Sequence, residues 1–179
     1  MSDRIEFNES PSSAIPSRLW SGRSDLSVAL ALVGILSVWL TSGAHADDVR
    51  WFSDDSPEAP TLIYGTQDSG YAALAFTCDQ SAGDVIFTYE FAPADAKDGM
   101  QTNVFLSSAG GEAVLSAVGQ HLEIDSLFIL EAATKLDADL IKVITARGLL
   151  SVKVDRSVEQ YPLEGAAEAS ADLIAACGP

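Results

Sequence analysis

The chain has 179 residues, with 26 Asp and Glu against 10 Lys and Arg, and its formal net charge is −16 at pH 7. A surface this acidic repels phosphate groups, so neither nucleic acid nor anionic lipid headgroups are expected as partners.

The first 46 residues have the layout of an export signal. Residues 1–25 form a polar extension, predicted to be disordered, that ends in a basic region containing Arg23. Residues 26–46 supply an apolar run of fifteen residues followed by Ala44-His45-Ala46, which matches an A-x-A cleavage site. Because a membrane-spanning helix needs ~20 apolar residues, we expect a cleaved signal peptide. The alternative is an inner-membrane anchor formed by uncleaved residues 26–40.

Cleavage after Ala46 would leave residues 47–179 as a single periplasmic or secreted domain, without stable membrane insertion. This part carries 22 acidic and 7 basic residues, so it keeps nearly all of the negative charge. Its length is sufficient for one hydrophobic core.

Short apolar runs separated by turn residues follow one another along this domain. In 84–92 the alternation is regular, because Val85, Phe87, Tyr89 and Phe91 share one face, as in a half-buried strand. Further strands are predicted at 49–52, 61–65, 71–78, 102–108, 112–119, 149–155 and 158–163, whereas 126–134 fits either a strand or a buried helix.

Two segments change to helical spacing. In 137–148, Leu140, Ile141 and Ile144 are spaced for one helix face, Asp137 can cap the start, and Gly148 follows the end. The Ala-rich segment 165–178 predicts a C-terminal helix whose apolar stripe contains Cys177. We therefore expect a mainly β domain of α+β type, an antiparallel β-sandwich or open barrel with this terminal helix.

The two cysteines, Cys78 and Cys177, predict one disulfide. Export places both in a compartment where disulfides persist. Their separation does not suit a thioredoxin-like redox motif, and two cysteines with the histidine of the exported part are too few for a structural zinc site. The bond would attach the terminal helix to the strand that contains Cys78.

The segment 121–125 is the one candidate for metal ligation. His121, Glu123 and Asp125 alternate with apolar residues, so a strand would place all three on one face, and imidazole with two carboxylates suits zinc or a harder cation. The competing interpretation is that these three residues form the solvent-exposed face of an ordinary amphipathic strand. No catalytic residue and no cofactor-binding loop is identified.

The positions of Trp51, Tyr64-Gly65, Cys78 and Cys177 resemble those in small exported domains of Gram-negative bacteria. The layout is similar to invasion-associated locus B proteins and to periplasmic accessory proteins of secretion systems. This resemblance implies a β-rich accessory domain and assigns no catalytic residues.

The sequence therefore predicts a non-catalytic binding or accessory domain without a cofactor, whose partner is another envelope protein. The alternative is a small hydrolase that uses paired carboxylates, because acidic pairs leave no local sequence signature.

Overall fold

The structure, a computed structural model, describes residues 49–54, 56–123 and 127–179. The extension predicted at 1–25 and the signal peptide predicted at 26–46 lie outside these residues, and both stay predictions. The described residues all belong to the contact unit Gly43–Pro179.

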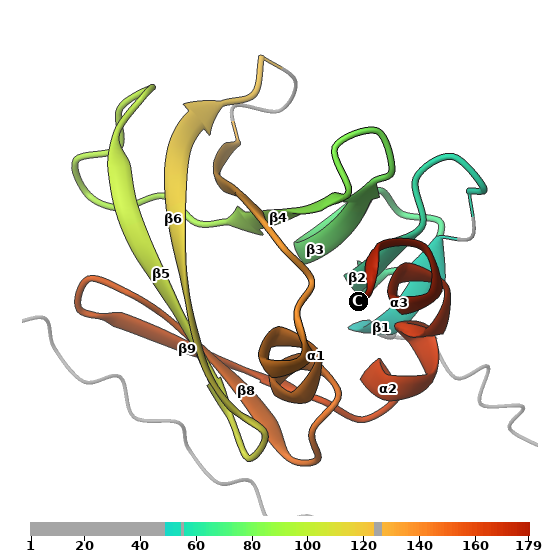
Figure 1. Ribbon diagram of the computed structural model, residues 1–179. Helices are drawn as coiled ribbons and strands as arrows, with labels where there is room; N and C mark the ends of the chain where they lie inside the picture. The colour runs from blue at the N-terminus through green and yellow to red at the C-terminus, as the bar shows by residue number, and fades with distance from the viewer. Residues whose placement is uncertain (1–48, 55, 124–126) are drawn as a thin grey trace, which may run out of the picture. The chain divides into compact units, whose positions relative to one another are not determined.

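Nine strands of the described residues form one antiparallel sheet in the order β1-β2-β3-β4-β7-β6-β5-β8-β9. The sheet curls into a half-barrel (Figure 1). The expectation of a mainly β fold is confirmed, in its open-barrel form. The strands are β1 (Val49–Asp54), β2 (Thr61–Thr66), β3 (Tyr71–Asp79), β4 (Asp84–Glu90), β5 (Gln101–Ser108), β6 (Gly111–His121), β7 (Phe128–Thr134), β8 (Leu149–Val154) and β9 (Ser157–Pro162).

The inner face of the sheet carries the core. Alternation in β4 is as predicted, because Val85, Phe87 and Tyr89 are almost completely buried. The ambiguous segment 126–134 contains strand β7, which pairs with β4 and β6. Most of the outward-facing residues remain at least partly exposed, so the half-barrel has a packed inner face and an outer face toward solvent.

Helix α1 (Ala138–Ile144) packs against β6 and β5 and contributes Leu140, Val143 and Ile144 to the core. The predicted cap is confirmed, since the Asp137 carboxylate accepts hydrogen bonds from the backbone N–H groups of Asp139 and Leu140. This side-chain cap satisfies donors that have no partner within the helix.

The C-terminal segment differs from the prediction of one helix, because it forms two. Helix α2 (Ala166–Ala169) packs against β1, and α3 (Ala171–Cys177) packs against β3 and β2. They meet at Ser170, which is fully buried and whose hydroxyl donates to the carbonyl of Ala167. This side-chain hydrogen bond takes the place of a backbone hydrogen bond that one continuous helix would make here.

The two edge strands, β1 and β9, meet through an aromatic cluster. The indole Nε1–H of Trp51 in β1 donates to the carbonyl of Pro162 in β9. The Tyr64 ring lies 5.2 Å from the Trp51 ring and 5.1 Å from the Tyr161 ring, measured between centroids. These contacts join the ends of the sheet at one point, without a strand pairing between them.

Candidate functional site

The outer face of β6, β5, β8 and β9 presents a row of side chains that the strand register aligns. Val114 lies opposite Phe105, Phe105 opposite Lys153, and Lys153 opposite Val158. Partners opposite each other in an antiparallel sheet have their side chains on the same face. The four residues therefore form a continuous row across four strands, which we call the outer apolar row.

This row is exposed. Val114 is 58% exposed, Val158 55% and Phe105 42%, and the Lys153 Nζ lies 5.9 Å from the centre of the Phe105 ring. The same outer face adds Val118 and Leu149. Five of the eight large apolar residues that are exposed in the described part of the chain thus gather on one face.

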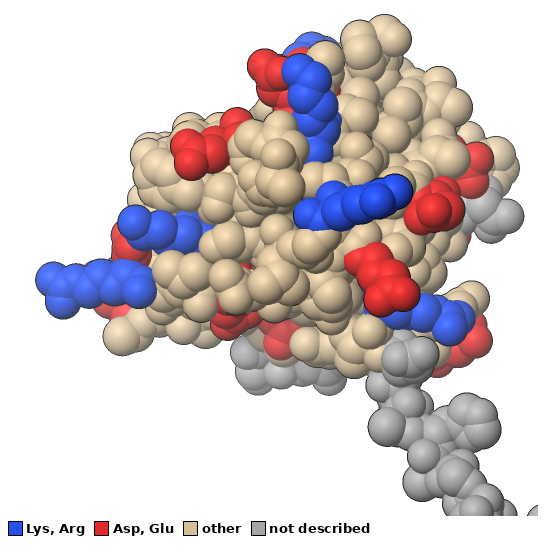
Figure 2. Space-filling model, turned by 90° about the horizontal axis from the view of Figure 1, so that it is seen from below, with Lys and Arg blue, Asp and Glu red and all other residues tan. Residues whose placement is uncertain are grey.

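Charge is scarce on this face. Its outward positions on the four strands are occupied mainly by apolar side chains and by uncharged polar ones such as Asn103 and Ser151, with Lys153 and Glu112 as the charged residues. Figure 2 views the molecule from below, where acidic and basic side chains are separated by broad uncharged areas. In a chain with a net charge of −16, an outer face with two charged side chains on four strands differs from the overall composition.

A shallow hollow of about 390 Å³ adjoins the row on β5 and β6. Its lining carries no charge and consists of four polar residues and two apolar ones. The lining residues are Gln101, Thr102, Asn103, Ser116, Ala117 and Val118. The hollow provides hydrogen-bonding groups directly beside the apolar residues.

Inside the half-barrel, Tyr161 donates its hydroxyl hydrogen to a carboxylate oxygen of Glu159. Burial raises the pKa values of both Tyr161 and Tyr89 far above the usual value for tyrosine. Both phenols therefore stay protonated at ordinary pH. In this state they are hydrogen-bonding groups of the core rather than bases or nucleophiles.

Three carboxylates of the described residues have lowered pKa values, and each belongs to a local hydrogen-bonded turn, loop or helix. The Ser81 hydroxyl and nearby backbone N–H groups lower the pKa of Asp79, and Lys142 lowers that of Asp139. The backbone N–H and then the imidazole of His121 lower the pKa of Asp98. A general acid requires a raised pKa, so none of these three carboxylates is suited to that role.

The predicted metal ligands do not share one strand, because β6 ends at His121 and Glu123 lies in the following turn. The Nδ1 of His121 lies 2.8 Å from Asp98 Oδ1, and its backbone N–H donates to the same oxygen. Asp125 lies outside the described residues. Within the described part no three potential ligands gather, and metal binding by this trio stays a prediction.

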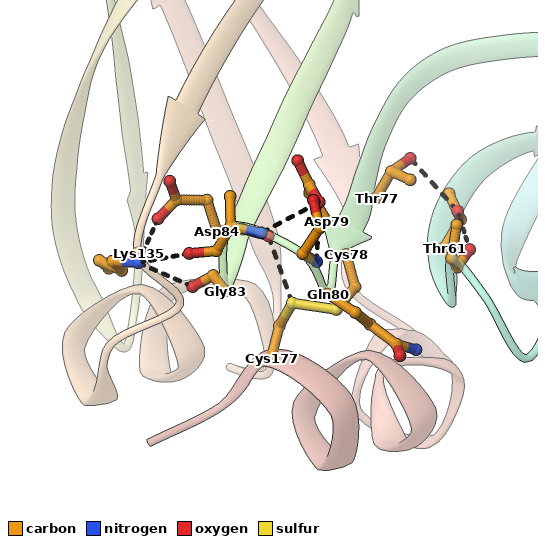
Figure 3. Close-up of a disulfide and its surroundings, with 12 residues drawn as sticks. Thr61, Thr77, Cys78, Asp79, Gln80, Gly83, Asp84, Lys135 and Cys177 are labelled. Carbon is orange, nitrogen blue, oxygen red and sulfur yellow. Dashed lines mark hydrogen bonds and ion pairs between the residues drawn. A yellow bond between two sulfur atoms is a disulfide. The ribbon is translucent and has the colours of Figure 1, made fainter.

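The predicted disulfide is confirmed. Cys78 in β3 and Cys177 at the end of α3 are bonded, with their Cα atoms 5.8 Å apart across 99 residues of sequence. Figure 3 shows Lys135 nearby, where its ammonium pairs with the Asp84 carboxylate at 2.6 Å and donates to the Gly83 carbonyl. The bond and the ion pair are structural features of this end of the sheet.

The outer apolar row was missed by the sequence analysis, although the sequence contains a signal for it. In β5, Val104, Phe105 and Leu106 are consecutive apolar residues, and a strand with one buried face can bury only alternate side chains. One of the three had to face outward. Its alignment with Val158 follows only from the pairing of β5 with β8 and β8 with β9.

No family model, curated protein or solved structure matches this chain. The resemblance to small exported Gram-negative domains therefore stays a prediction. No helix among the described residues is long and apolar enough to cross a membrane.

Proposed function

We propose that this domain is a non-catalytic protein-binding module that acts in the periplasm or outside the cell, with the outer apolar row as the centre of its binding surface. The observation that carries the proposal is the alignment of Phe105, Val114 and Val158 on a face with few charges.

The composition of this face is that of an interface centre. Centres of protein interfaces are depleted in charged residues and enriched in aromatic ones, and contiguous exposed apolar patches mark interaction sites. The polar hollow on β5 and β6 supplies hydrogen-bonding groups at the margin of the apolar row, where interfaces are usually polar.

The charge of the chain indicates the chemistry of the partner. Since the rest of the surface is strongly acidic, long-range attraction favours a protein with basic side chains around an apolar patch. The partner we propose is therefore an envelope or extracellular protein with an apolar centre and a basic rim. The disulfide and the predicted signal peptide support a location outside the cytoplasm.

Site-specific photocrosslinking in cells of the source organism tests this proposal. A photoreactive amino acid replaces Val114 in the exported protein, and the control places it at Ala175, an exposed position on α3. We expect a discrete adduct with a second protein from position 114 and not from position 175. Introducing Phe105→Asp beside the probe at 114 should abolish the adduct, since it places a charge at the centre of the row.

The melting temperature of the Phe105→Asp protein must first be shown to match that of the unsubstituted protein. The proposal is overturned if position 114 gives no adduct, if position 175 gives the same one, or if Phe105→Asp leaves the adduct unchanged.

A further inference from the structure

Strand β9 exposes backbone hydrogen-bonding groups along its free edge. It pairs with β8 alone in the described sheet. The Leu163 N–H donates to the Gly148 carbonyl at 2.8 Å, which identifies these two residues as a hydrogen-bonded pair of the ladder. Because such pairs alternate in antiparallel strands, every second residue of β9 directs its N–H and C=O toward β8, and the others direct theirs away.

This parity fixes which groups face the edge. Ser157, Glu159 and Tyr161 direct their backbone groups toward β8, whereas Val158 and Gln160 direct theirs outward. The backbone groups of Pro162 also point away from β8. Its carbonyl is therefore free to accept the Trp51 indole N–H, and it does so.

The free part of the edge is therefore short and defined. Pro162 has no N–H, and its carbonyl is already bonded to Trp51. Val158 and Gln160 have no hydrogen bond from the outward-facing backbone groups to any other described residue. The opposite edge strand, β1, is packed against helix α2 instead.

We propose that two copies of this chain pair through β9, antiparallel and around a two-fold axis at Val158, so that the two sheets become continuous. Only residues that direct their backbone groups outward can form the new hydrogen-bonded pairs. Val158 of each copy then lies opposite Val158 of the other, and Ser157 lies opposite Glu159.

Charge and space select this register over the two that shift the second strand toward Pro162. A shift that pairs Val158 with Gln160 places the two Glu159 side chains opposite each other, and like charges in that position are destabilising. A shift that pairs Gln160 with Gln160 brings the second strand against Pro162, whose carbonyl is already bonded to Trp51. With the axis at Val158, Arg156 lies opposite Gln160.

The β8–β9 turn lies apart from the helices and from the opposite edge of the sheet. In Figure 1 this turn projects to the lower left, away from β1, α2 and α3. A two-fold pairing also satisfies both free edges at once, whereas an added peptide strand would expose a new edge. A second copy is therefore the occupant that leaves no unpaired strand at this end.

Pairing also extends the outer apolar row. Val114, Phe105, Lys153 and Val158 of one copy continue into Val158, Lys153, Phe105 and Val114 of the other, on the same side of one sheet. The pairing itself does not depend on the proposed function. If both hold, the dimer presents one docking face of twice the width.

Cysteine crosslinking tests the register. In a hydrogen-bonded antiparallel pair the Cα atoms are about 5.5 Å apart, a distance that a disulfide can span. Val158→Cys should therefore give a disulfide-linked dimer under mild oxidation, visible on a non-reducing gel. Val114→Cys is the matched control, because Val114 is equally exposed but lies in the middle of the sheet, and it should give no disulfide-linked dimer at the same concentration.

Light scattering of the protein without new cysteines provides the second measurement. We expect the average mass to rise toward that of a dimer as salt is added, because salt screens the repulsion between two acidic copies. Val158→Asp should keep the mass of a monomer and an unchanged melting temperature. The proposal is overturned if the unsubstituted protein is monomeric at all concentrations, or if Val158→Cys crosslinks no faster than Val114→Cys. A partner adduct at position 114 from an unsubstituted protein that scatters as a monomer would retain the proposed function without the dimer.

Discussion

The two ends of the sheet are stabilised in different ways. At the β1–β3 end, helices α2 and α3 pack on the strands, and the Cys78–Cys177 disulfide attaches α3 to β3. At the β8–β9 end, the strands carry exposed apolar side chains and an edge with free backbone groups. The closed end holds the fold together, and the open end keeps groups available for contacts with other molecules.

Removing the disulfide tests the closed end and has the largest expected effect. The double variant Cys78→Ser/Cys177→Ser loses a crosslink that closes a long loop, which typically contributes roughly 2–4 kcal/mol. For a domain of this size the melting temperature should fall on the order of 10 °C, as measured by calorimetry. An unchanged melting temperature would show that α3 stays docked through packing alone.

The matched control is Val158→Ser at the open end. Its side chain is exposed, so the free energy of unfolding should change by less than about 0.5 kcal/mol. A large loss here would mean that the open end also carries the stability of the fold.

Trp51→Phe breaks the link between the two ends. It removes the hydrogen bond to the Pro162 carbonyl and part of the packing on Tyr64, and we expect a loss of roughly 1–2 kcal/mol in a urea titration followed by circular dichroism. Tyr71→Phe, at an exposed ring, is the control and should be neutral. Equal midpoints for the three proteins would contradict the idea that Trp51 holds the edges together.

Asp98→Asn tests the connection between β4 and β5, and we expect it to cause the smallest loss of stability. The lowered pKa of Asp98 means that its bonds to His121 stabilise the fold above the unfolded pKa, near 4, and that this contribution is lost as pH falls through the lower folded value. The variant should therefore melt below the unsubstituted protein at pH 6, and the difference should shrink at pH 3. A difference in melting temperature that is constant with pH would show that the ionised Asp98 is not the cause. Glu112→Gln is the control for the loss of one charge.

Local patterns predicted most of the elements. The alternation in β4, the Asp137 cap of α1 and the disulfide were all inferred from the sequence and are confirmed. The break between α2 and α3 was not predicted, because Ser170 in an Ala-rich segment is no strong helix breaker, and its effect depends on burial.

The candidate site could not be predicted as a unit, because it depends on long-range pairing. Phe105 and Val158 are brought onto one row by β8, which pairs with both of their strands. A run of consecutive apolar residues shows only that some side chain faces outward. Which residues become its neighbours is decided by the order of strands in the sheet.

The position of Cys177 also has a consequence for biosynthesis. Cys177 follows all the described strands, so the thiol of Cys78 has no partner in this sequence until the 99-residue interval has been synthesised. During that time Cys78 can react only with thiols or disulfides of other molecules. Because two cysteines allow a single intramolecular pairing, the chain cannot form a wrong internal disulfide. The species open to a wrong disulfide is the nascent chain, whose Cys78 can react with another molecule.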